Sequence, residues 1–185
     1  MAVIQSTVAR GALHIVAGEG DDIVRLGRPE ETTEEETASI VEGEMDRPEV
    51  HFRRGVQVRL GNGDDSFAAN GLHVNGLGLN VNGGLGTDSI RVVETHAPIL
   101  SLDGGQGESS DRVSIQDSAT RLLFVGLGGG DDMLSLGGVK TQLALLYGGP
   151  GEADTLTLLG ENLIRQRRVT GFEIRNPSEE AAPVA

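Results

Sequence analysis

The sequence predicts an all-β protein, a right-handed parallel β-solenoid of seven or eight coils with a period of 21–23 residues. One reason is a motif of glycines closed by an aspartate, which recurs with gaps of 43, 23, 23, 21 and 22 residues. The other is a pair of apolar residues at i and i+2 on each side of every motif, typical of short strands with one buried face. Such a unit cannot bury its apolar face alone, so successive units must stack. The aligned aspartates are Asp22, Asp65, Asp88, Asp111, Asp132 and Asp154.

Each coil is therefore expected to run strand, Gly-Asp loop, strand and outer turn, with the apolar pairs pointing inward. The pairs before the loops are Leu13 and Ile15, Val56 and Val58, Leu79 and Val81, Leu100 and Leu102, Leu123 and Val125, Ala144 and Leu146. The pairs after the loops are Val24 and Leu26, Phe67 and Ala69, Ile90 and Val92, Val113 and Ile115, Leu134 and Leu136, Leu156 and Leu158.

The first gap is nearly two periods long and holds the densest run of acidic residues, Glu30–Thr37. Pro48 takes a position where the pattern requires an apolar residue. We expect residues 28–50 to form a degenerate coil or a mobile, protruding acidic loop, which would separate Asp22 from the other aspartates. The rest of 1–175 is expected to be one solenoid domain, with 169–174 as a closing strand and 176–185 as a disordered tail.

Composition excludes several classes of protein. The net charge of −13 argues against nucleic-acid binding, which favours a basic face. The chain has no cysteine for disulfides and no apolar run of membrane-spanning length. The N-terminus lacks a basic segment followed by an apolar one, so no signal peptide is expected.

The loops resemble the RTX, or hemolysin-type, calcium-binding repeat, whose pattern is G-G-x-G-x-D-x-U-x with U a large apolar residue. Residues 83–90, GGLGTDSI, match every specified position. Residues 17–24, 60–67 and 127–134 miss only the first glycine. The loops at 104–111 and 148–154 keep G-G-x-G but insert two residues and one residue before the aspartate, which could distort them.

The resemblance implies a non-catalytic structural module in which calcium bridges stacked loops, at the cell surface or outside the cell. Calcium takes six to eight oxygen ligands from carboxylates and carbonyls. Without a signal peptide, the options are signal-less secretion, excision from a larger protein, or an intracellular protein.

The candidate metal-binding residues are Asp22, Gly63, Asp65, Gly84, Gly86, Asp88, Gly105, Gly107, Asp111, Gly128, Gly130, Asp132, Gly149, Gly151 and Asp154. Asp21, Asp64 and Asp131 are secondary candidates or solvated residues. Only one edge carries the loop, so a second calcium row is not expected.

Three alternatives remain open. The aspartates could cap backbone N–H groups in a metal-free solenoid. The chain could be a calcium-independent scaffold that self-associates through its open coil edges. Asp103 and Asp111 could form a carboxylate pair, as in parallel β-helix enzymes that process polysaccharides, but long loops and aromatic sugar platforms are missing.

The four histidines occur singly with no ligand spacing, and Arg165, Arg167 and Arg168 are expected to cap the last coil.

Overall fold

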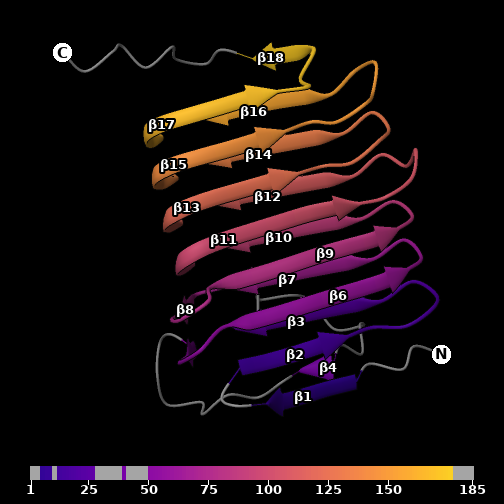
Figure 1. Cartoon of the computed structure of the whole chain (residues 1–185), viewed down its shortest axis with the longest axis vertical. Helices are drawn as coiled ribbons and strands as arrows, with labels where there is room; N and C mark the ends of the chain where they lie inside the picture. Colours follow the sequence, from indigo (N-terminus) through magenta and orange to yellow (C-terminus); the bar gives the residue numbers. More distant parts are fainter. Residues whose placement is uncertain (1–4, 10–11, 28–38, 41–49, 177–185) are drawn as a thin grey trace, which may run out of the picture.

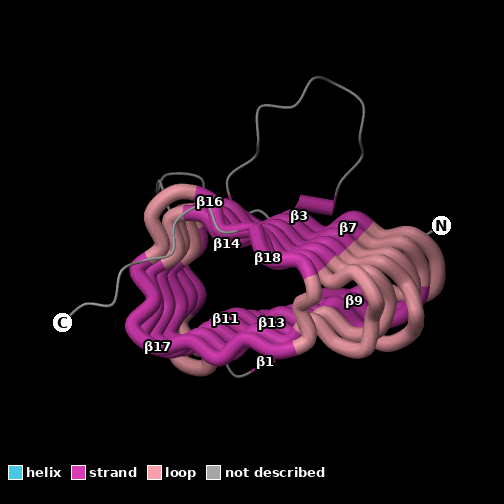
Figure 2. The backbone as a smooth tube through the Cα atoms, turned by 90° about the horizontal axis from the view of Figure 1, so that it is seen from above, coloured by secondary structure: helices cyan, strands magenta, loops and turns pink. Residues whose placement is uncertain are grey.

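The computed structural model describes residues 5–9, 12–27, 39–40 and 50–176, which form two sheets facing each other across a narrow core. Figure 1 shows the strands of both sheets stacked coil upon coil. Viewed along the stack in Figure 2, successive coils superpose, and the loops that join the two sheets lie at the two edges. The prediction of an all-β parallel solenoid is confirmed.

The first sheet has the order β1-β2-β6-β9-β11-β13-β15-β17, with β5 and β8 paired to each other and β8 also to β11. Its strands are β1 Gln5–Ala9, β2 Ala12–Val16, β5 Val50–Phe52, β6 Val56–Asn62, β8 Leu72–Val74, β9 Leu79–Leu85, β11 His96–Gly105, β13 Ala119–Gly126, β15 Lys140–Tyr147 and β17 Leu163–Thr170. All of these pairs are parallel except β1 with β2, which is antiparallel.

The second sheet has the order β18-β16-β14-β12-β10-β7-β3-β4 and is parallel throughout. Its strands are β3 Ile23–Gly27, β4 Ser39–Ile40, β7 Ser66–Asn70, β10 Ser89–Val93, β12 Arg112–Gln116, β14 Met133–Gly137, β16 Thr155–Leu159 and β18 Ile174–Asn176. The described residues make about five complete turns, fewer than the seven or eight expected, because the first and last coils are incomplete.

The core lies between the sheets and consists of aliphatic columns. Every apolar pair named from the sequence is buried except Leu158, which is half-buried against the core. Leu79, Val81 and Val92 are fully buried and Ile90 is 1% exposed, as the alternation predicted. The register sets like residues above one another, so that Phe67, Ile90 and Val113 form one inward column.

The first two Gly-Asp loops are direct neighbours, contrary to our expectation that a damaged coil separates them. Strand β2 pairs with β6 and β3 pairs with β7, and no coil is inserted between. The reason is that β4 lies on the other side of β3, at the end of the sheet. Most of the expected degenerate segment 28–50 and the expected tail 176–185 lie outside the described residues, Ser39–Ile40, Val50 and Asn176 excepted.

The last coil carries charge where earlier coils carry apolar residues. Arg167 is in register with Ala144 of the inward column, and it is exposed because no further described strand covers it. A charged residue on an edge strand discourages pairing with another sheet. Phe172 is 6% exposed and closes part of this end. The expected closing strand over 169–174 is not formed as one strand, because β17 ends at Thr170 and β18 begins at Ile174.

An aspartate at an inward position should unfold the solenoid, whereas one at the adjacent outward position should be tolerated. We expect Val113→Asp to lower the free energy of unfolding by more than about 4 kcal/mol, because a charge would enter a core without polar partners. The control Ser114→Asp on the same strand should change it by less than about 1 kcal/mol. Chemical denaturation measures both. Equal effects would mean that the two faces of β12 are assigned wrongly.

Candidate functional site

The six aligned aspartates form one continuous hydrogen-bonded column along the edge where the Gly-Asp loops lie. The backbone N–H of each aspartate donates to a carboxylate oxygen, Oδ1, of the aspartate in the next coil, at 2.7–2.9 Å. The bonds run from Asp22 to Asp65, Asp88, Asp111, Asp132 and Asp154 in turn. We call this set the aspartate column. It begins at Asp22, which the sequence analysis had wrongly set apart.

The aspartate column is buried, and most of its members keep one carboxylate oxygen without a hydrogen-bond partner. Their side chains are 0–6% exposed. Buried, unpartnered oxygens belong to five of the six residues, Asp22, Asp65, Asp88, Asp132 and Asp154. An unpaired buried polar atom is uncommon because it loses its hydration without compensation. Each of these oxygens is therefore available for a further ligand.

The glycines of the motif make room for this arrangement. Gly84 and Gly86 have φ angles of 123° and 113°, in the left-handed region, and a Cβ on either would collide with the backbone of the coil beneath. A Cβ on Gly83 would collide with the Oδ2 atom of Asp88. The glycine spacing thus follows from close stacking of backbone on backbone and of carboxylate on backbone.

Nearly all the predicted loop glycines share this backbone conformation. Positive φ angles occur at Gly63, Gly84, Gly86, Gly105, Gly107, Gly128, Gly130 and Gly149, but not at Gly151. The two loops with inserted residues keep their aspartates in the column, since Asp111 and Asp154 both accept the expected N–H bond. The insertions are therefore accommodated without breaking it.

A second row of aspartates lies outside the column and is also hydrogen-bonded. Asp21 accepts the N–H of Asp64 at 3.0 Å, and Asp64 accepts that of Thr87 at 2.8 Å. Asp131 accepts two N–H groups of the next loop at 3.1 Å. These side chains are the secondary candidates of the sequence analysis, and they hold the exposed part of adjacent loops together.

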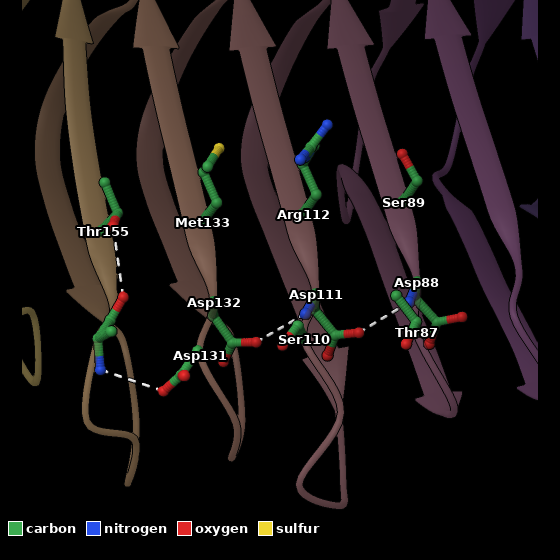
Figure 3. A pocket seen from close by; sticks show the side chains of 11 residues that line it. Thr87, Asp88, Ser89, Ser110, Asp111, Arg112, Asp131, Asp132, Met133 and Thr155 are labelled. Carbon is green, nitrogen blue, oxygen red and sulfur yellow. Dashed lines mark hydrogen bonds between the residues drawn. The ribbon is translucent and has the colours of Figure 1, made fainter.

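A groove of about 360 Å³ opens over the middle of the aspartate column. Figure 3 shows Asp88, Asp111 and Asp132 in line beneath it, joined by dashed hydrogen bonds. The lining of this groove includes three members of the column, Asp88, Asp111 and Asp132, and beside them Thr87, Ser110, Arg112 and Asp131. Solvent thus comes close to the loops that hold the column where the family pattern is complete.

The column ends at a residue that the sequence analysis did not single out. The N–H of Asp154 donates to the carboxylate of Glu173 at 2.9 Å, so a glutamate replaces the missing next aspartate. Glu173 follows Asp154 by 19 residues and lacks the preceding Gly-x-Gly. The separation of Glu173 from Asp154 in the sequence is close to one coil period, and this spacing is the signal that could have predicted its place at the end of the column.

Burial and neighbouring carboxylates disfavour ionisation of the column aspartates from Asp65 to Asp154. Burial raises the pKa of Asp88 from 3.8 to about 7 and those of Asp111 and Asp132 to about 6. The N–H bond from the preceding coil lowers each pKa, and neighbouring carboxylates raise it. Burial also raises the pKa of Asp65 and of Asp154. The column is therefore a stack of charges that needs neutralisation.

Asp103 lies near the column but is held by a different partner. Burial raises its pKa, and the side-chain amide of Asn82 donates to its carboxylate at 3.1 Å. The charge of Asp103 in turn raises the pKa of Asp111. The pair considered for catalysis is thus close enough to interact.

Three of the four histidines recur with the coil period, a spacing that the search for short ligand motifs did not cover. His51, His73 and His96 are 22 and 23 residues apart and lie in register on β5, β8 and β11. Their rings stack, with centroids 5.0 Å and 5.9 Å apart. A test of the coil period, rather than of short ligand spacings, would have found them. His14 is elsewhere, 3.0 Å from the Gln57 side chain.

Among the described residues, no three His, Cys, Asp or Glu side chains already converge as a metal site. Nor does that part of the chain contain a helix able to cross a membrane. Comparison with family models, curated proteins and solved structures finds no match to this chain. The resemblance to RTX repeats therefore depends on the loop motif alone.

The pKa values predict that the metal-free protein loses stability as the pH rises. At pH values between the ordinary aspartate pKa of 3.8 and the raised pKa values of about 6 to 7, the folded chain holds protons that the unfolded chain has released. Raising the pH through this range therefore favours the unfolded chain. The free energy of unfolding should fall by at least about 1.4 kcal/mol from pH 4.5 to pH 7.5, the equivalent of one pKa unit. Urea denaturation in chelator at a series of pH values measures it. Asp88→Asn should flatten this slope, and stability that rises with pH would contradict the assignment.

Proposed function

We propose that this protein is a non-catalytic, calcium-binding structural module in which calcium neutralises the aspartate column and ties adjacent coils together. The observation that carries the proposal is the stack of six buried carboxylates, five of which have an unpartnered oxygen. The RTX-like motif, complete at 83–90, supports the same ion.

The charge of the column is the physical reason for a cation. The neighbouring charges that raise the pKa of Asp88 are Asp111, Asp65 and Asp64, so like charges surround it. Carboxylates stacked in this way either take up protons or bind a positive ion. At neutral pH, a divalent ion is the more effective of the two, because it can act on two coils at once.

The residues present fit calcium by their donor chemistry. Calcium is a hard ion that binds carboxylate and carbonyl oxygens, and these are the groups along this edge. An ion shared by two loops needs two carboxylates and backbone carbonyls, not a cluster of three acidic side chains. Asp88 and Asp111 would be the central pair, since the groove opens over them. Six aspartates in register leave five gaps between coils.

A second candidate is a metal-free scaffold in which protons neutralise the column. The N–H bonds to each Oδ1 atom favour it, because they give the aspartates a structural role without any ion. Self-association through the coil ends is the related possibility, and the exposed Arg167 in the inward column opposes it. Under the calcium proposal, an extracellular or cell-surface site of action follows from the high external calcium concentration.

Calcium should stabilise metal-depleted protein by mass action. Each site should add about 2.7 kcal/mol to the free energy of unfolding at a hundredfold excess of calcium over its dissociation constant. The test is thermal and urea denaturation at pH 7.5 with a calcium series, starting from protein shown by elemental analysis to be metal-free. If millimolar calcium does not change the melting temperature, the calcium proposal is wrong and the metal-free, protonated scaffold is the better account.

Asp88→Asn separates the two candidates further. The amide keeps an oxygen acceptor for the N–H of Asp65 but removes a charge, so it should raise the stability of metal-free protein at pH 7.5 and reduce the gain from calcium. Asp117→Asn, on the opposite edge, should leave both quantities unchanged. If Asp88→Asn and wild type gain equally from calcium, the ion is bound elsewhere.

A further inference from the structure

The histidine column, His51, His73 and His96, is a feature that the proposed function does not use. Its members lie on β5, β8 and the start of β11. This edge of the solenoid is opposite the edge with the Gly-Asp loops, such as the loop that joins β9 to β10 (Figure 1). His51 and His96 are exposed, and His73 is half-buried at the outward position between buried Leu72 and Val74. The coil period thus arranges three imidazoles in a solvent-accessible row.

We propose that the histidine column binds a divalent transition-metal ion of the zinc class through imidazole nitrogens of adjacent coils. Imidazole suits zinc, copper and nickel, whereas calcium prefers oxygen ligands. The ion would bind between His73 and one neighbour, and His73, as the middle member, belongs to both pairs. This site and the aspartate column therefore select different metals on different edges.

The spacing of the rings is compatible with a shared ion. A zinc–nitrogen bond is about 2.0–2.1 Å long, so two imidazoles on one ion place their ligating nitrogens within about 4 Å of each other. Stacked rings with centroids 5.0 Å and 5.9 Å apart can reach this separation by rotating about their side-chain bonds. Since no three such ligands converge in the part of the chain that the structure describes, water or a carboxylate would complete the coordination.

The groove at the His96 end of the column contains two carboxylates. His96 lines a groove of about 330 Å³ together with Asp117 and Glu161, and Lys140 is the cationic residue there. In register with His96 the next strand has Ala119, which is too small to cover the imidazole. The net charge of −13 favours the approach of any cation. An ion can thus approach His96 from solvent.

The test is a titration of the full chain, without a histidine tag, with zinc by calorimetry and with copper by electron paramagnetic resonance. We expect zinc binding in the micromolar range and nitrogen hyperfine structure from two imidazoles. His73→Gln should weaken zinc binding at least tenfold, while His51→Gln and His96→Gln should each have a smaller effect. His14→Gln is the matched control and should bind as wild type, because His14 is outside the column.

Several outcomes would overturn the proposal. These are no zinc binding at about 100 µM, unchanged binding by His73→Gln, or equal loss in His14→Gln. The melting temperature of each variant in chelator shows whether it folds. A loss of zinc affinity in His73→Gln supports the proposal when this variant and the wild type have the same melting temperature in chelator. Should the column only stack rings for stability, His73→Gln would instead lower the melting temperature in chelator. Calcium at millimolar concentration should not displace zinc, which keeps this test independent of the calcium proposal.

Discussion

The bond from one aspartate N–H to the next aspartate carboxylate is the interaction on which the rest of the structure depends. It repeats from Asp22 to Asp154 and sets the register in which every apolar column is aligned. It also requires the carboxylate to lie inside the loop, against the backbone of Gly83 in the third repeat. The glycine pattern follows from this contact together with the close stacking of backbone on backbone, and the inserted loops keep the contact at Asp111 and Asp154.

The same contact creates the electrostatic problem that makes the column a functional candidate. Desolvation and neighbouring carboxylates raise the pKa of Asp88 to about 7, so this residue lies near its titration point at neutral pH. Under the calcium proposal, protons and the cation compete for the same carboxylates, and the stability of the solenoid is linked to both. On that proposal, the protein would respond to its ionic surroundings through the fold itself rather than through a separate binding domain.

The inward faces could be predicted from the sequence because alternation of apolar residues and the repeat period are local signals. Pairing across a long insertion is not local, which is why Asp22 was wrongly separated from Asp65. The histidine column was missed because its members are ligand neighbours only after folding, through a coil period that had been applied to aspartates alone. Glu173 was missed because its loop lacks the glycines, although its carboxylate makes the same bond as the column aspartates.

The most direct test of the account is a carboxyl ¹³C titration of the column aspartates by nuclear magnetic resonance, with and without calcium. In metal-free protein, the carboxyl of Asp88 should titrate with a pKa of about 7 and those of Asp111 and Asp132 with pKa values of about 6. With calcium bound, they should remain ionised well below those values. Titration of all three near the ordinary pKa of 3.8 in metal-free protein would contradict the account, because a column that ionises freely has no need of a proton or a cation.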